Sequence, residues 1–245
     1  MMKKMIRIVL TLLALTIAFA GYVYASPMYP ISKGDIVEFH NGIGNTGGGE
    51  FGISLYDSED ILFNTFCLEK NEYVSYNAPF LVTGILAGAQ KGGQGGQATS
   101  GYDPISNATK WLYWHYASQD LNDYVGEYEY NTQDAANSLQ RAFWYLEDEL
   151  VSTSEQDSFW ADDLAKGLVK NAKAYENQGV LYDVAVMNIV YDKDIYYNGN
   201  LIHAEGEYAQ SQLIADVAPV PEPATMVLLG AGLVGLAFYR RKMKK

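Results

Sequence analysis

The spacing of apolar residues changes twice along this 245-residue chain. Residues 35–86 and 180–217 hold short alternating or aromatic-rich runs, which are typical of strands. The residues between them, over 107–177, repeat apolar side chains every three or four positions, as helices do. Strands grouped before and after a block of helices predict an α+β fold with antiparallel strands. They disfavour a parallel sheet in which strands and helices alternate.

The expected elements have defined bounds in the sequence. Three central helices are expected over 107–119, 132–150 and 154–177, and either Asn131 or Thr132 can cap the second one. The Gly- and Gln-rich stretch 88–101 is expected to be a loop without core residues. Strands are expected over residues 35–40, 50–56, 61–68, 73–86 (one or two strands), 180–191, 195–197, 201–204 and 208–217.

The first 25 residues are typical of a secretory signal peptide. Three basic residues precede an apolar run over 8–20 that is short for a membrane span. Val23 and Ala25 supply the small side chains that signal peptidase needs at −3 and −1. We therefore expect export, with cleavage after Ala25. The alternative is an uncleaved N-terminal anchor.

The last 26 residues, 220–245, contain a three-part pattern. Pro221-Glu222-Pro223 is followed by an uncharged apolar segment over 224–239 and then by a basic end. As a helix, that segment would be about 24 Å long, enough for a short transmembrane helix with its basic end in the cytoplasm. The alternative is that residues 220–245 are not cut and form a plain single-pass membrane anchor.

This C-terminal pattern resembles the PEP-CTERM sorting signal of Gram-negative bacteria. In that family an exosortase, which is a membrane cysteine transpeptidase, cuts near the Pro-Glu-Pro. The resemblance implies export across the inner membrane and transient anchoring by the C-terminal helix. Release to the cell surface or the extracellular matrix then follows. Residues 26–219 remain as a single secreted domain.

Composition narrows the function of the secreted part. Residues 26–220 hold 9 basic and 28 acidic side chains, a net charge of −19, so we expect no binding to nucleic acid. One cysteine excludes an internal disulfide framework and a Cys-rich metal module. The oxygen-bearing residues over 192–200 lack the spacing of an EF-hand loop. We therefore expect no cofactor and no metal.

The single cysteine, Cys67, admits three interpretations. It is a buried apolar side chain, a protease nucleophile, or one end of another covalent bond. A protease would need a partner histidine, and the three available ones have no recognisable local signature: His40, His115 and His203. A turnover enzyme is therefore not expected.

Two short segments together resemble the Cys–Gln (TQXA-type) thioester domain of Gram-positive surface adhesins. They are Phe-Cys-Leu-Glu over 66–69 and Leu-Gln-Arg-Ala-Phe-Trp over 139–144, and the likeness extends over residues 35–190. Leu139 stands where the family has the Thr of TQXA. The resemblance implies a thioester between Cys67 and Gln140 that couples covalently to amines on a surface or matrix molecule.

A thioester survives only where water is kept out, so the surround should be apolar. Phe66, Phe143 and Trp144 are the candidates for this surround, with either Trp111 or Trp114. His115, Asp148 or Glu69 could accept the proton of the attacking amine. The alternative function is a structural protein of the extracellular or biofilm matrix, sorted by exosortase and without a reactive bond.

Overall fold

The computed structural model describes residues 28–216, apart from 46–47, 92, 94–100 and 127. The expected signal peptide and its cleavage site at Ala25 lie outside the described residues. The Pro221-Glu222-Pro223 segment and the expected transmembrane helix over 224–239 also lie outside them. Across the part that is described, no helix is both long and apolar enough to cross a membrane.

Six strands form one sheet in which every neighbouring pair is antiparallel. The strand order is β10-β7-β4-β1-β2-β3. All eight residues of β7 are buried, because β4 and β10 flank this strand and both of its faces are covered. The bounds are β1 Ile36–Asn41, β2 Phe51–Leu55, β3 Phe63–Thr65, β4 Phe80–Leu86, β7 Val184–Tyr191 and β10 Tyr208–Ala215.

The two edges of this sheet meet just after β3. Cys67 forms an isolated antiparallel bridge with Gln212 of β10. On either side of it, the backbone N–H of Leu213 donates to the carbonyl oxygen of Phe66, and that of Leu68 donates to Ser211, each at 3.1 Å. The segment after β3 therefore closes the sheet on itself, and Cys67 lies on the seam.

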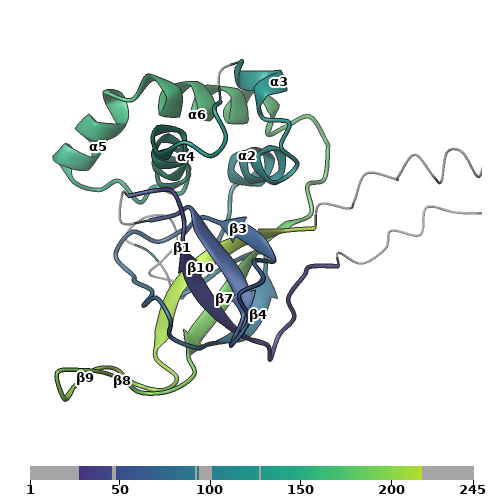
Figure 1. The fold of residues 1–245 in the computed structure, drawn as a ribbon. Coiled ribbons are helices and arrows are strands. Elements are labelled where there is room, and N and C mark those ends of the chain that lie inside the picture. The colour runs from purple at the N-terminus through teal and green to yellow at the C-terminus, as the bar shows by residue number, and fades with distance from the viewer. Residues whose placement is uncertain (1–27, 46–47, 92, 94–100, 127, 217–245) are drawn as a thin grey trace, which may run out of the picture.

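Two hairpins complete the strands. β5 Gly88–Gln90 pairs with β6 Tyr102–Pro104, and β8 Ile195–Tyr197 pairs with β9 Asn200–His203. The second hairpin projects from the sheet away from the helices (Figure 1). The expectation that 88–101 is only a loop is wrong for its start, because Ala89 of β5 pairs with Asp103 and is buried.

The helices gather over one end of the sheet (Figure 1). α4 is the most strongly amphipathic of them, and Thr132 caps it by accepting a hydrogen bond from the N–H of Ala135. The bounds are α2 Asn107–Ala117, α3 Asn122–Val125, α4 Gln133–Leu146, α5 Thr153–Trp160 and α6 Asp163–Tyr175. An antiparallel sheet combined with helices is the fold class that the sequence predicts.

The count of three central helices is wrong, because α3 was not expected and the expected helix over 154–177 is divided into α5 and α6. Asp162 leaves the helical conformation and accepts a hydrogen bond from the N–H of Ala165, which begins α6. Its carboxylate also accepts from Ser138 and Arg141 of α4. These contacts fix Asp162 as a cap and dock α6 onto α4.

Candidate functional site

Cys67 and Gln140 lie in direct contact where the seam of the sheet meets α4. Both residues are 0% exposed. Sγ of Cys67 is 3.3 Å from Oε1 of Gln140, and Nε2 of Gln140 donates to the carbonyl oxygen of Cys67 at 2.9 Å. The sulfur therefore faces a fixed side-chain amide whose nitrogen and oxygen are both hydrogen-bonded.

Two backbone N–H groups converge on the amide oxygen of Gln140. The N–H of Gly49 donates at 2.7 Å and the N–H of Cys67 at 3.3 Å. Paired N–H donors around a carbonyl oxygen polarise the carbonyl and stabilise the negative charge that develops when a nucleophile attacks its carbon. The arrangement is therefore that of an oxyanion hole built around Gln140.

The glycines before β2 make this close approach possible. A Cβ added to Gly48 would lie 2.7 Å from Cδ of Gln140 and 2.6 Å from Cζ2 of Trp144. A Cβ added to Gly49 would lie 2.7 Å from the carbonyl oxygen of Thr65. The sequence pattern did not identify these glycines as part of the site, although Gly48 covers Gln140 and Gly49 donates to it. Three consecutive glycines in the sequence are the signal that could have indicated a close approach of the backbone to another group.

The surround of the pair contains the three aromatic side chains expected there. Phe66 and Phe143 are fully buried, with ring centroids 5.4 Å apart. Trp144 is 3% exposed, and the ammonium of Lys70 lies 5.5 Å from its ring centroid. These rings exclude water from the sulfur and the amide carbon.

The two other tryptophans lie elsewhere. Trp111 stacks on Tyr175 with centroids 5.2 Å apart, on the side of α2 that faces α6. Trp114 contacts Tyr182. Neither of them is part of the Cys67–Gln140 surround, because α2 presents these side chains to α6 and to the chain that leads into β7.

Burial raises the pKa of the Cys67 thiol, and the carboxyl of Glu69 raises it further. The backbone N–H of Gly49 and the indole N–H of Trp144 act in the opposite direction with smaller effect. The thiol is therefore protonated in the free form. A thiol of high pKa is also a poor leaving group, which slows the cleavage of any acyl bond that it carries.

Acidic side chains lie next to the seam. Glu69 is 2% exposed and accepts the N–H of Ser211 at 2.8 Å; burial and the charge of Glu72 raise its pKa well above the usual range. Burial and the charge of Glu149 raise the pKa of Glu72 to about 7. The carboxyl two positions from Cys67 therefore has a raised pKa, caused first by burial and then by the neighbouring carboxyl of Glu72.

The histidines have partners of their own, away from the thiol. His115 is 2.8 Å from Asp120, His40 is 2.8 Å from Ser54, and His203 is 3.0 Å from Glu207. Asp148, the other expected proton acceptor, is exposed beyond the end of α4. No Cys–His pair of a protease is present among the described residues. Of the three expected acceptors of the amine proton, Glu69 is the one that remains beside Cys67.

A cleft of about 500 Å³ reaches Gly48, which covers Gln140 and is called the glycine lid below. Gly48 lines it, together with Tyr76, Gln210 and the turn over 41–45. The hydroxyl of Tyr76 donates to Asn41 at 3.3 Å across the cleft. No charged side chain is among its described lining residues, so an uncharged nucleophile meets no fixed charge on the way to Gln140.

No three His, Cys, Asp or Glu side chains in the described ranges are gathered so that they could hold a metal ion.

Comparison with known proteins identifies the C-terminal signal. Residues 219–242 match the PEP-CTERM protein-sorting motif, which indicates processing by exosortase and sorting to the cell surface. Among solved structures, the chain is similar to the N-terminal thioester domain of fibronectin-binding protein SfbI from Streptococcus pyogenes. The identity is 14% and the TM-score is 0.40, with 80% of this chain and 100% of that chain covered. No curated protein matches the chain.

Proposed function

We propose that this protein is a surface-sorted adhesin-like protein whose Cys67 and Gln140 form an internal thioester that couples covalently to amines. One observation carries the proposal: Sγ of Cys67 lies 3.3 Å from a glutamine amide oxygen that accepts two backbone N–H groups. The sorting motif over 219–242 supports the surface location.

The bond would form by attack of Sγ of Cys67 on Cδ of Gln140. The S–C bond forms while the C–N bond to Nε2 breaks, and the thiol proton leaves with the nitrogen as ammonia. The N–H groups of Gly49 and Cys67 would hold the negative charge on Oε1 during this step. Its prerequisites are a fixed amide and a dry site, and both are properties of the geometry described above.

In coupling to a partner, an amine would be the nucleophile and the Cys67 thiol would be the leaving group. A neutral primary amine in the cleft beside Gly48 attacks Cδ of Gln140, and the S–C bond breaks. An amide forms between Gln140 and the amine, and the amine proton passes to Cys67 Sγ. The acyl group is used once, so each molecule would make a single attachment and would not turn over.

Intact-mass measurement tests the proposal. Protein comprising residues 26–220, never exposed to amines or high pH, should weigh one ammonia less than its sequence. Cys67→Ala and Gln140→Ala should each have the full mass of their own sequences. Methylamine should add once to the wild type, at Gln140, and should release one titratable thiol at Cys67.

A wild-type mass equal to the sequence mass would contradict the proposal. The protein would then be a structural component of the extracellular matrix, with an unreacted Cys67–Gln140 contact in its core. Gln156→Ala removes another glutamine, on α5, and serves as the matched control. It should retain both the lowered mass and the uptake of methylamine.

A further inference from the structure

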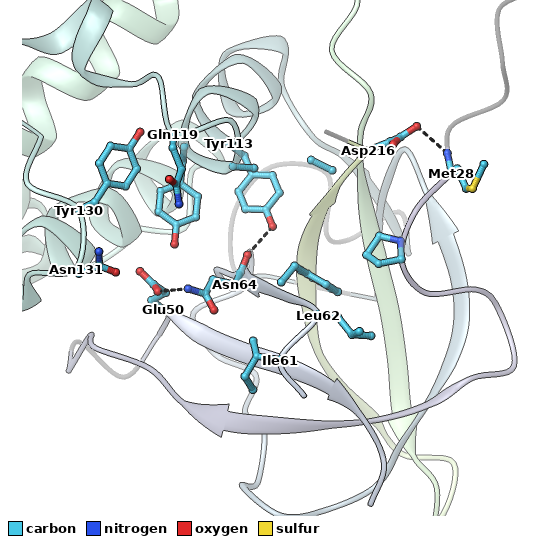
Figure 2. A pocket seen from close by; sticks show the side chains of 15 residues that line it. Met28, Glu50, Ile61, Leu62, Asn64, Tyr113, Gln119, Tyr130, Asn131 and Asp216 are labelled. Carbon is cyan, nitrogen blue, oxygen red and sulfur yellow. Dashed lines mark hydrogen bonds between the residues drawn. The ribbon is translucent and has the colours of Figure 1, made fainter. Parts of the chain in front are cut away.

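A second cavity, of about 560 Å³, opens between the start of β2, the chain before β3 and α2. Its size lies in the range of ordinary small-molecule sites. Figure 2 shows the carboxylate of Glu50 and the side chains of Asn64, Tyr130 and Asn131 around one part of it. Asp216 lines another part.

The carboxylate of Glu50 is the most unusual group in this cavity. The residue is 6% exposed, and its side chain accepts hydrogen bonds from Nδ2 of Asn64 at 2.5 Å and from the hydroxyl of Tyr116. Burial raises its pKa in spite of these bonds. Both donors are neutral, so they orient the carboxylate without balancing its charge.

No lysine, arginine or histidine is among the described residues that line the cavity. A buried carboxylate is costly unless a cation pairs with it. Since none of the described lining residues is a cation, a bound cation is the group that would complete the site.

The rings beside Glu50 favour the same kind of ligand. Tyr116 stacks with Tyr113 and with Tyr130, with centroids 6.1 Å and 6.0 Å apart, and all three line the cavity. Faces of aromatic rings attract organic cations. Ile61 and Leu62 are 46% and 41% exposed and line the same cavity, where they offer an apolar surface to a hydrocarbon stem.

We infer that this cavity binds an alkylammonium ion, with its charged nitrogen next to Glu50 and its hydrocarbon part against the tyrosines and Ile61.

The site is separate from the Cys67–Gln140 pair. None of Cys67, Gln140 and Trp144 is among the described residues that line the cavity, and Phe66, next to Cys67, meets Tyr116 of the cavity with ring centroids 5.0 Å apart. The two sites share one short stretch of backbone, because Gly49 donates to Gln140 and the next residue, Glu50, lines the cavity. Binding in the cavity does not require a thioester.

Choline and its neutral isostere 3,3-dimethyl-1-butanol test the inference. Both are titrated calorimetrically into the full chain carrying Cys67→Ala, in a nonionic detergent, so the outcome does not depend on the proposed thioester. Choline should bind at least about tenfold more tightly than the alcohol, because only choline carries a charge for the tyrosine faces and Glu50.

Two substitutions locate the binding. Glu50→Gln keeps the shape of the side chain and should weaken choline binding at least about tenfold. Gln119→Arg, at the exposed rim, introduces a cation of the protein's own and should weaken it similarly. Glu59→Gln removes an exposed charge outside the cavity and should change nothing. Equal affinities for the two probes, no binding at millimolar choline, or undiminished binding by Glu50→Gln would each overturn the inference.

Discussion

The backbone N–H of Gly49 donates to Oε1 of Gln140 at 2.7 Å, although 91 positions separate the two residues. The contact joins the loop before β2 to the middle of α4 directly above Cys67. This hydrogen bond fixes the carbonyl that a thiol would attack. It depends on Gly48, because a side chain at that position would collide with Gln140.

Gly48→Ala should disrupt this arrangement. The added methyl group would lie 2.7 Å from Cδ of Gln140, so either the loop or the glutamine must move. Because a small displacement of the reacting groups strongly lowers the rate of a reaction, we expect methylamine uptake to fall by about tenfold or more. Uptake is measured by mass spectrometry after a fixed incubation.

Gly167→Ala is the matched control for that change. Nothing lies within 4 Å of the added methyl group, and the residue is inside α6. It should leave uptake unchanged and stabilise the protein by about 0.5–1 kcal/mol, because alanine favours the helix. Unchanged uptake in Gly48→Ala would mean that the glycine lid does not position Gln140.

The stability of the fold should depend on the ionisation of Glu72. Burial and the charge of Glu149 raise its pKa in the folded protein to about 7 from an ordinary value of 4.5. Between these values the folded state binds more protons than the unfolded state, so the free energy of unfolding falls as pH rises. Glu72→Gln should resemble the wild type at pH 5 and be more stable at pH 8.

Urea midpoints at the two pH values measure this difference. Glu205→Gln, which removes an exposed carboxylate from the turn after β9, is the control. It should shift the midpoints equally at both pH values. A Glu72→Gln variant that loses stability at pH 8 would show that the ionised carboxylate is a stabilising group.

Asp162→Ala should destabilise the helical layer by about 2 kcal/mol. It removes the N-cap of α6 and the carboxylate that accepts from Ser138 and Arg141. Asp163→Ala, one position later, removes an exposed ion pair with Lys166 and should have little effect. Similar losses in the two variants, measured by thermal unfolding, would mean that Asp162 is not the docking contact.

Replacement of Pro221-Glu222-Pro223 by alanines should block sorting. The sorting motif spans 219–242 and contains the Pro-Glu-Pro, so we expect exosortase recognition to depend on these three residues. The variant should stay in the inner membrane with its basic tail attached, as detected by a C-terminal tag. Pro219→Ala keeps the Pro-Glu-Pro and should be processed normally. A triple variant that reaches the surface without its tail would exclude exosortase processing.

The sequence predicted the parts of this protein that depend on local pattern. The antiparallel strands and α4 follow from the spacing of apolar residues, and the sorting motif follows from three adjacent segments. The break between α5 and α6 was missed, because Asp162 caps a helix through contacts with Ser138 and Arg141 of another element. Periodicity within one segment does not contain that information.

The candidate site was predictable only in part. The motifs predicted Cys67 and Gln140. The hydrogen bonds to Oε1 of Gln140 come from backbone N–H groups, and the type of a residue does not determine where its N–H points. The carboxylate of Glu50 was also missed, since its burial depends on how Tyr116 of α2 meets the start of β2. A single acidic residue in a strand otherwise reads as an exposed one.

The position of Gln140 on α4 has a mechanical consequence. If a target is attached at its side chain, tension toward the C-terminal sorting motif passes through residues 140–216 and then along the tail. Residues 28–139, which include Cys67, lie outside that covalent path. Rupture of the seam between Cys67 and Gln212 would then let residues 140–216 extend, so the molecule would lengthen without releasing the target and residues 28–139 would carry no tension.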